Sequence, residues 1–219
     1  MSSNKPGARW GCGWFWLAVG LLAVGAAFAL DDAVDGRLYP PAHETSSQMA
    51  VLVSKYGDWP PALLAGLVIV TALVGCRKMA TARLVLLILV AGLLTGLASD
   101  LLRAAVGRTR PTATAPQGFY GLRYQGKWIV GKYQFSSFPS GHTAVWAGLA
   151  GAAWFRRRTW GVALLAVAVV VAWSRIALGC HHFSDVTASV VWGFALGPWL
   201  CRRLESGTNK IWSKMGLPL

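Results

Sequence analysis

Residues 174–185 read SRIALGCHHFSD and lie between two apolar segments that are each long enough to enter a bilayer. This stretch brings together Arg175, His181, His182 and Asp185. Charged groups at such depth are costly and by default mark a functional site. If Asp185 opens the following helix, His181 lies four residues earlier on the same face. A carboxylate that holds one imidazole nitrogen leaves the other free as a base or nucleophile. A polar loop with a capping aspartate is the simpler alternative.

Composition indicates a membrane protein. The chain has 219 residues, of which 55% are hydrophobic and only 13% charged, and its mean hydropathy is +0.48. Tryptophan favours membrane interfaces, and glycine lets helices approach closely. The formal net charge of +13 would also suit nucleic acid, but the basic residues stand at the ends of apolar runs rather than on one soluble face. We therefore expect a single membrane-embedded domain over residues 1–219, with membrane lipids and no nucleic acid as partners.

The apolar runs predict an all-α integral membrane protein with six transmembrane helices. The fourth to sixth runs fall near or below the roughly twenty residues that a full span needs. Polar residues replace apolar ones at one end of these three helices, which predicts a site at the membrane edge. A signal-peptidase-like site at residues 27–29 is an alternative for the first run, although its length favours an uncleaved span. The expected spans are Trp14–Leu30, Pro60–Cys76, Leu84–Leu102, Ser140–Arg156, Trp160–Trp173 and Phe183–Cys201.

Two polar segments separate these runs, and the charges predict their side of the membrane. Residues 31–59 contain a short helix expected on the membrane surface near 46–56, and residues 103–139 form a long basic loop. The two termini and the turns near residues 77 and 157 hold twelve Lys/Arg and one acid, against nine and seven on the other side. The positive-inside rule then places both termini in the cytoplasm and the polar segments outside.

The cysteines predict neither a disulfide nor a metal site. Cys12, Cys76 and Cys201 fall near the cytoplasmic side, so Cys180 has no partner on the outer side. The Cys and His spacings match no zinc pattern. We expect no metal and no other cofactor.

Three polar clusters converge on the outer side of the predicted bundle. The first is Arg103 followed six residues later by Arg110 and Pro111, and the second is PSGH at residues 139–142. The third is the stretch at residues 174–185. A helix that starts with Ser140 and Gly141 offers free backbone N–H groups and a hydroxyl, which suit an anion. Taken alone, PSGH also fits an ordinary helix start, and the basic loop fits attraction to anionic lipid.

Together the three clusters resemble the signature of the type 2 phosphatidic acid phosphatase superfamily. That signature is Lys-x6-Arg-Pro, Pro-Ser-Gly-His and Ser-Arg-x5-His-x3-Asp. The second and third elements are complete here, whereas Arg103 replaces the lysine of the first. The charge is kept, but a guanidinium favours bidentate contacts. The order of the clusters and their placement on six spans match as well.

The resemblance implies a role for each matching residue. His181 would attack phosphorus and form a phosphohistidine, Asp185 would orient it, and His142 would protonate the leaving oxygen and then activate water. The phosphoryl oxygens would be held by Arg103, Arg110, Arg175, Ser140 and the Gly141 backbone. His182 also lies within reach of Asp185, so only the register of the motif favours His181.

The resemblance further implies a metal-independent lipid phosphatase of a bacterial cytoplasmic membrane, with its active site facing the periplasm. Phosphatidic acid, phosphatidylglycerol phosphate, undecaprenyl pyrophosphate and lipid A are the candidate substrates. A lipid phosphotransferase that uses the same phosphohistidine is one alternative, and a non-catalytic lipid-phosphate binder is another. A haloperoxidase, which shares the motifs, is disfavoured by the apolar composition.

Overall fold

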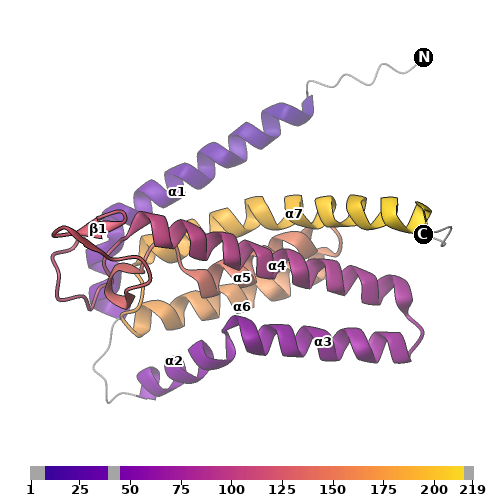
Figure 1. The fold of residues 1–219 in the computed structure, drawn as a ribbon, viewed down its shortest axis with the longest axis horizontal. Coiled ribbons are helices and arrows are strands. Elements are labelled where there is room, and N and C mark those ends of the chain that lie inside the picture. Colours follow the sequence, from indigo (N-terminus) through magenta and orange to yellow (C-terminus); the bar gives the residue numbers. More distant parts are fainter. Residues whose placement is uncertain (1–7, 39–44, 215–219) are drawn as a thin grey trace.

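The computed structural model describes the backbone of residues 8–38 and 45–214 and the side chains of residues 18–38 and 47–210 (Figure 1). Lys5 and the side chains of Arg9 and Cys12 lie outside this part. The fold is mostly helical, as predicted. Its elements are α1 (Ala8–Leu38), α2 (Thr45–Tyr56), α3 (Trp59–Gly75), α4 (Met79–Val106), β1 (Arg123–Tyr124), β2 (Lys127–Trp128), the 3-10 helix Tyr133–Phe135, α5 (Gly141–Trp154), α6 (Arg158–Ala177) and α7 (Phe183–Lys214).

Each predicted span corresponds to a helix, and α2 corresponds to the predicted surface helix. Several helices run further than the apolar patterns suggested. The first was predicted to end at Leu30, but α1 continues to Leu38. Its last turns carry Asp31, which is 7% exposed, and Asp35, and both carboxylates accept hydrogen bonds from residues near the start of α7. Hydropathy predicts only where the apolar run ends, at Leu30. The helix continues beyond this point, where Asp31 and Asp35 make polar contacts with the start of α7.

Length and hydropathy alone identify fewer membrane spans than six. Within the described residues, α4 and α6 are long and apolar enough to cross a membrane, and the pair α2–α3, bent by 54°, counts as a third. Helix α5 has only 14 residues, short of the roughly twenty that a full span needs.

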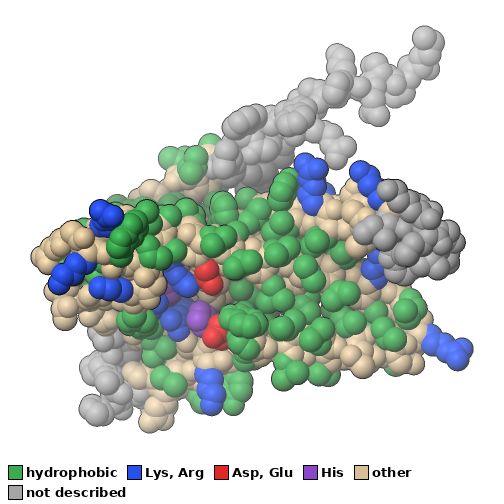
Figure 2. All heavy atoms as spheres, in the orientation of Figure 1, with side chains coloured by type: hydrophobic (Ala, Val, Ile, Leu, Met, Phe, Trp, Pro, Cys, Tyr) green, Lys and Arg blue, Asp and Glu red, His purple; other side chains and the backbone are tan. Residues whose placement is uncertain are grey.

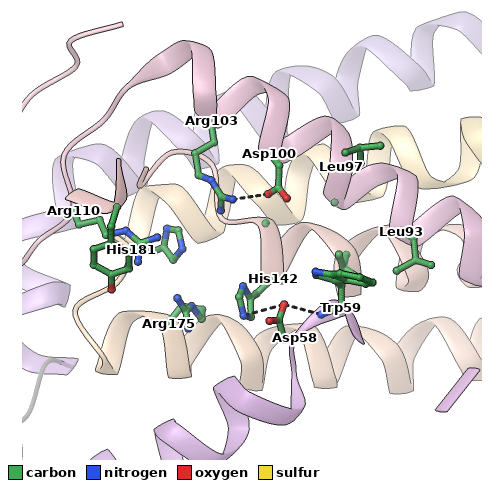
Figure 3. A pocket seen from close by; sticks show the side chains of 14 residues that line it. Asp58, Trp59, Leu93, Leu97, Asp100, Arg103, Arg110, His142, Arg175 and His181 are labelled. Atoms are coloured by element: carbon green, nitrogen blue, oxygen red, sulfur yellow. Dashed lines mark hydrogen bonds and ion pairs between the residues drawn. The ribbon is translucent and has the colours of Figure 1, made fainter. Parts of the chain in front are cut away.

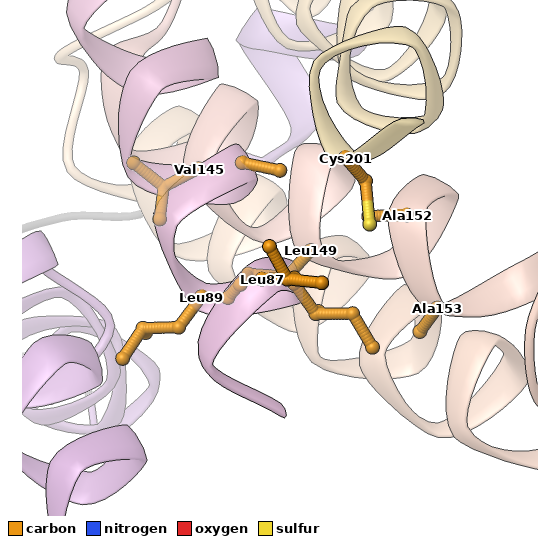
Figure 4. Packing of buried hydrophobic residues seen from close by; sticks show 9 residues of the cluster. Leu87, Leu89, Val145, Leu149, Ala152, Ala153 and Cys201 are labelled. Atoms are coloured by element: carbon orange, nitrogen blue, oxygen red, sulfur yellow. The ribbon is translucent and has the colours of Figure 1, made fainter. Parts of the chain in front are cut away.

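Helix α5 is the centre of the bundle and contacts α4, α6 and α7. Buried side chains of α4, α5 and α7 form the main apolar cluster, which includes Leu87, Leu149 and Cys201 (Figure 4). Helix α7 packs so closely on α5 that a Cβ added to Gly197 would lie 2.3 Å from the carbonyl oxygen of Gly148. Small residues at such crossings are typical of helices packed in membranes.

One end of the bundle carries the polar structure. The loop between α4 and α5 contains the antiparallel β1–β2 hairpin and folds over this end (Figure 1). Its aromatic side chains Tyr120, Tyr124 and Phe135 pack against one another. Figure 2 shows basic, acidic and histidine side chains gathered near this end, beside a largely hydrophobic helical surface. The predicted site residues belong to this polar end.

Candidate active site

A cavity of about 620 Å³ opens at the polar end of the bundle (Figure 3). Six of the eight predicted site residues line it, and they come from α4, the loop before α5, α5, α6 and the segment before α7. Ser140 and Asp185 lie behind the lining. The predicted residues in the lining are Arg103, Arg110, Gly141, His142, Arg175 and His181, and they are joined by Asp58, Trp59, Asp100, Tyr133 and apolar residues of α4 and α5.

His181 is held in one tautomer. Its Nδ1 lies 2.6 Å from the carbonyl oxygen of Ser137, and because a carbonyl only accepts, Nδ1 must carry the hydrogen. Nε2 therefore carries the lone pair, and this buried atom has no hydrogen-bond partner among the described residues. Burial lowers the pKa of His181 to about 3, so the ring is neutral near pH 7. The geometry provides an imidazole nitrogen able to act as a nucleophile at the cavity wall.

Asp185 supports His181 indirectly. The prediction that its carboxylate directly orients the ring needs correction, because Oδ2 lies 3.6 Å from Nδ1 and the closer partner is the Ser137 carbonyl. Asp185 Oδ2 accepts hydrogen bonds from the Ser137 hydroxyl and from the backbone N–H of His182, the latter at 2.8 Å. Asp185 thus holds Ser137, and the carbonyl of Ser137 in turn holds the ring of His181. The negative charge of Asp185 also lies close to this imidazole.

His182 is turned away from the cavity. Its Nδ1 lies 2.7 Å from Asp35 Oδ2, and its Nε2 lies 3.2 Å from the carbonyl oxygen of Thr109. Both ring nitrogens are therefore occupied in joining α1 and the loop to the start of α7. Geometry now supports the choice of His181 that the motif register alone had favoured.

Asp185 is anchored by a buried network, here called the Arg108 clasp, which consists of Asp31, Arg108, Ser184 and Asp185. Arg108 Nη1 donates to Asp185 Oδ1 and to Ser184 Oγ, both at 2.6 Å. Its Nη2 donates to Asp31 Oδ2 at 2.8 Å. Aromatic rings of Phe28 and Phe119 lie within 5.0 Å of the guanidinium. Asp31, Arg108 and Ser184 are not among the site residues predicted from the sequence, although an acid at the end of an apolar run is a usable signal.

Two arginines present unused donors to the cavity. Arg110 stacks 3.7 Å above the ring of Tyr133, and its Nε and Nη1 are buried without an acceptor among the described residues. The same holds for Nε of Arg175, whose Nη1 donates to Ser54 Oγ. Buried polar groups in proteins are nearly always paired. Converging guanidinium donors of this kind fit the oxygens of a phosphate group.

Arg103 lies on the α4 side of the cavity, where a lysine was expected from the family pattern. Its Nη2 contacts Asp100 Oδ1 at 2.8 Å. A Cβ added to Gly141 would lie 2.4 Å from that carboxylate oxygen. Glycine at the start of α5 therefore lets the helix N-terminus and the Asp100–Arg103 pair share one wall of the cavity.

Ser140 does not line the cavity, in contrast to the prediction that it would hold a phosphoryl oxygen. Its backbone N–H donates to Ser189 Oγ at 2.8 Å, and its hydroxyl accepts from Thr143 Oγ1 at 3.1 Å. These contacts dock the start of α5 against α7. The first N–H groups of the helix lack intrahelical partners, so the α5 N-terminus still favours an anion.

His142, on the first turn of α5, faces the cavity next to Asp58. Its Nε2 lies 3.3 Å from Asp58 Oδ1. Asp58 caps α3 by accepting the Trp59 N–H at 2.8 Å. Asp58 is not among the site residues predicted from the sequence, yet an aspartate just before Trp59 and Pro60 is a recognisable helix start.

Fold and site together define the class: a bundle of apolar helices whose polar end holds two histidines and three arginines around one cavity. The chain belongs to the PAP2 superfamily, whose family model matches residues 80–206. This confirms the resemblance on which the sequence analysis relied.

Relatives and solved structures agree with this assignment. The chain is 37% identical to the lipid A 1-phosphatases of Rhizobium johnstonii and Rhizobium etli over 106 residues, or 48% of its length. It spans 40% and 42% of those proteins, about two fifths of their length. Its fold is similar to that of a transmembrane PAP2-type phosphatidylglycerolphosphate phosphatase from Bacillus subtilis (TM-score 0.57, 18% identity, 88% and 94% of the two chains). It is also similar to that of Aquifex aeolicus LpxE (TM-score 0.54, 17% identity, 79% and 95%).

Proposed function

We propose that the protein is a membrane lipid phosphatase that works through a phosphohistidine on His181. The observation that carries the proposal is the free Nε2 of His181 at the wall of a cavity lined by Arg103, Arg110 and Arg175. Family membership and the names of the relatives agree with it.

In the first step, the Nε2 lone pair attacks phosphorus and the bond to the lipid oxygen breaks. His142 donates a proton to that oxygen, so the lipid leaves as an alcohol. The hydrogen on Nδ1 stays in its bond to Ser137, and the nearby Asp185 carboxylate offsets the positive charge that develops on the ring. The three guanidiniums compensate the charge on the equatorial oxygens.

In the second step, a water molecule attacks the phosphohistidine from the side that the lipid vacated. His142, now neutral, takes a proton from this water, the P–N bond breaks, and inorganic phosphate leaves. His181 returns with its lone pair on Nε2, and His142 returns protonated for the next cycle. The arginines and the α5 N-terminus supply the charge compensation, and the proposed reaction therefore requires no metal ion.

For the membrane, we propose one domain with six spans, formed by α1 and α3 to α7, and with α2 on the surface. The clustered Lys/Arg residues favour an orientation with both termini in the cytoplasm and the cavity on the outer side. The bacterial relatives favour the cytoplasmic membrane as the location. A cavity at the headgroup level suits a substrate whose acyl chains remain in the bilayer.

Among possible substrates, we place the phosphate of lipid A first, because the two Rhizobium relatives are named for it. Phosphatidic acid, phosphatidylglycerol phosphate and undecaprenyl pyrophosphate are the comparison substrates. The test is phosphate release by purified protein in detergent with excess EDTA, with His181→Ala as control. Release from one substrate that the variant loses supports the proposal, and acid-labile ³²P label on His181 identifies the intermediate.

If the folded protein released phosphate from none of these substrates, the hydrolase proposal would be overturned. Transfer of the ³²P label to a lipid hydroxyl in place of water would instead indicate the phosphotransferase. Binding of the substrates without labelling or release would indicate the non-catalytic binder.

A further inference from the structure

The junction of α2 and α3, residues 54–59 and here called the elbow, takes part in the site although it lies outside residues 80–206 that match the family. Helices α2 and α3 meet there at a bend of 54°. Ser54 Oγ accepts a hydrogen bond from Arg175 Nη1. The carbonyl oxygen of Gly57 accepts one from Trp146 Nε1 at 2.8 Å. The elbow is thus fastened to α6 and α5 by two residues that precede Asp58.

The Asp58 carboxylate is held in place by the start of α3 as well as contacting His142. Its Oδ1 accepts the Trp59 N–H, which fixes the carboxylate as the cap of α3. The same oxygen lies 3.3 Å from His142 Nε2 (Figure 3). Side-chain exposures of 40% for Asp58 and 21% for His142 leave both groups open to the cavity that they line.

Cations otherwise dominate the surroundings of His142. A proton on its ring meets repulsion from the three guanidiniums of the cavity, and Asp100 is already in contact with Arg103. Among the described residues, Asp58 is the carboxylate that contacts the His142 imidazole. Among the described residues, the charged or titratable groups that line the cavity with His142 are Asp58 of the elbow, Asp100 and Arg103 of α4, Arg110 and Tyr133 of the loop, Arg175 of α6 and His181 before α7.

We infer that Asp58 is a positioning residue for His142: it holds Nε2 and stabilises the protonated ring, which leaves Nδ1 to exchange the proton with the leaving oxygen and with water. This inference rests on the proposed phosphatase function. A carboxylate on one imidazole nitrogen fixes the tautomer and favours the imidazolium that forms during proton transfer. In this arrangement, the elbow adds Asp58 to the site as a second carboxylate, which is not part of the three family motifs.

The test uses Asp58→Asn in the full chain, which keeps the size and the capping oxygen of the side chain but removes its charge. Asp32→Asn is the matched control, because Asp32 is an exposed carboxylate of α1 that does not line the cavity. Each variant is assayed with the lipid substrate that the wild type hydrolyses and with p-nitrophenyl phosphate. The p-nitrophenolate ion leaves without a proton, so release of this group does not need an acid.

With the lipid substrate, Asp58→Asn is expected to lower kcat by about 10²-fold, the scale of general acid–base assistance, with little change in KM. With p-nitrophenyl phosphate, a rapid burst of one p-nitrophenolate per protein should precede slow turnover. The burst arises because phosphorylation of His181 is spared while the attack of water, which needs His142 as base, is not.

Lipid turnover by Asp58→Asn equal to that of Asp32→Asn would overturn the inference and leave the proposed function intact. Equal loss of the burst and of turnover would also overturn it, because it would show a structural role of the elbow. If the wild type releases no phosphate from any lipid, the proposed function fails first and the inference fails with it.

Discussion

The two histidines of the cavity are held in opposite ways. His181 is 1% exposed, and behind it the Arg108 clasp joins α1, the loop before α5 and the start of α7. His142 is 21% exposed and meets a single carboxylate on the elbow. The proposed nucleophile is therefore fixed before substrate arrives, while the proposed proton carrier keeps the freedom to serve two steps.

The largest expected effect separates His181 from its neighbour. His181→Ala should lower lipid phosphate turnover on the order of 10⁴-fold or more, as loss of a nucleophile does in other enzymes. His182→Ala should keep a substantial fraction of turnover, since that ring only joins Asp35 and Thr109 behind the cavity. Initial rates of phosphate release decide this, and the reverse ranking would show that the nucleophile has been misassigned.

The next effect tests the Arg108 clasp, which lies behind the buried His181. Asp31→Asn removes one of the two carboxylates that neutralise the buried Arg108 and should cost about 3 kcal/mol of stability, the lower end of the range for breaking a buried ion pair, because Asp185 remains as a partner. The thermal unfolding midpoint in detergent should fall clearly below that of Asp32→Asn, whose carboxylate is exposed. Equal midpoints would mean that the clasp does not stabilise the fold.

A smaller effect follows from the neutral state of His181. The unfolded chain takes up a proton there below about pH 6.5, whereas burial delays this to about pH 3 in the folded protein. The free energy of unfolding therefore decreases as the pH is lowered through this interval, by about 2 kcal/mol from pH 7 to pH 5. Unfolding midpoints should show a steeper loss for the wild type than for His181→Gln. Parallel curves would contradict the buried neutral imidazole.

The smallest effect concerns the elbow, which borders the more exposed His142. Ser54→Ala removes the hydroxyl that accepts from Arg175 and should weaken substrate binding by about 1 kcal/mol, the typical net value of one hydrogen bond. This appears as a KM several times higher with a nearly unchanged kcat. Ser54→Thr keeps the hydroxyl and should restore the KM. A KM that stays at the wild-type value in Ser54→Ala would show that the elbow does not position Arg175.

Local patterns predicted the helices and the three motif clusters, because apolar runs and fixed spacings are written into short stretches. They did not predict the contacts between distant segments. Asp31 and Ser184 meet although 153 residues separate them, and no local pattern encodes such a pairing. Ser140 was misplaced for the same reason, since its docking onto Ser189 depends on how α5 crosses α7.

Helix ends were predicted less well than helix cores. Hydropathy places the end of the first span at Leu30, but the helix runs on because Asp31 and Asp35 gain hydrogen bonds there. Asp58 carried a capping signal, yet its contact with His142 depends on the bend between α2 and α3.

The Arg108 clasp also sets an order for biosynthesis. Asp31 is synthesised with the first helix, Arg108 arrives 77 residues later, and the start of α7 completes the set only after another 76 residues. Until then each of these charges must stay in water or find a temporary partner at the membrane surface. Closure of the clasp thus ties the arrival of α7 to the positioning of His181, because a chain that stops before α7 lacks Ser184 and Asp185 and leaves Arg108 with Asp31 alone.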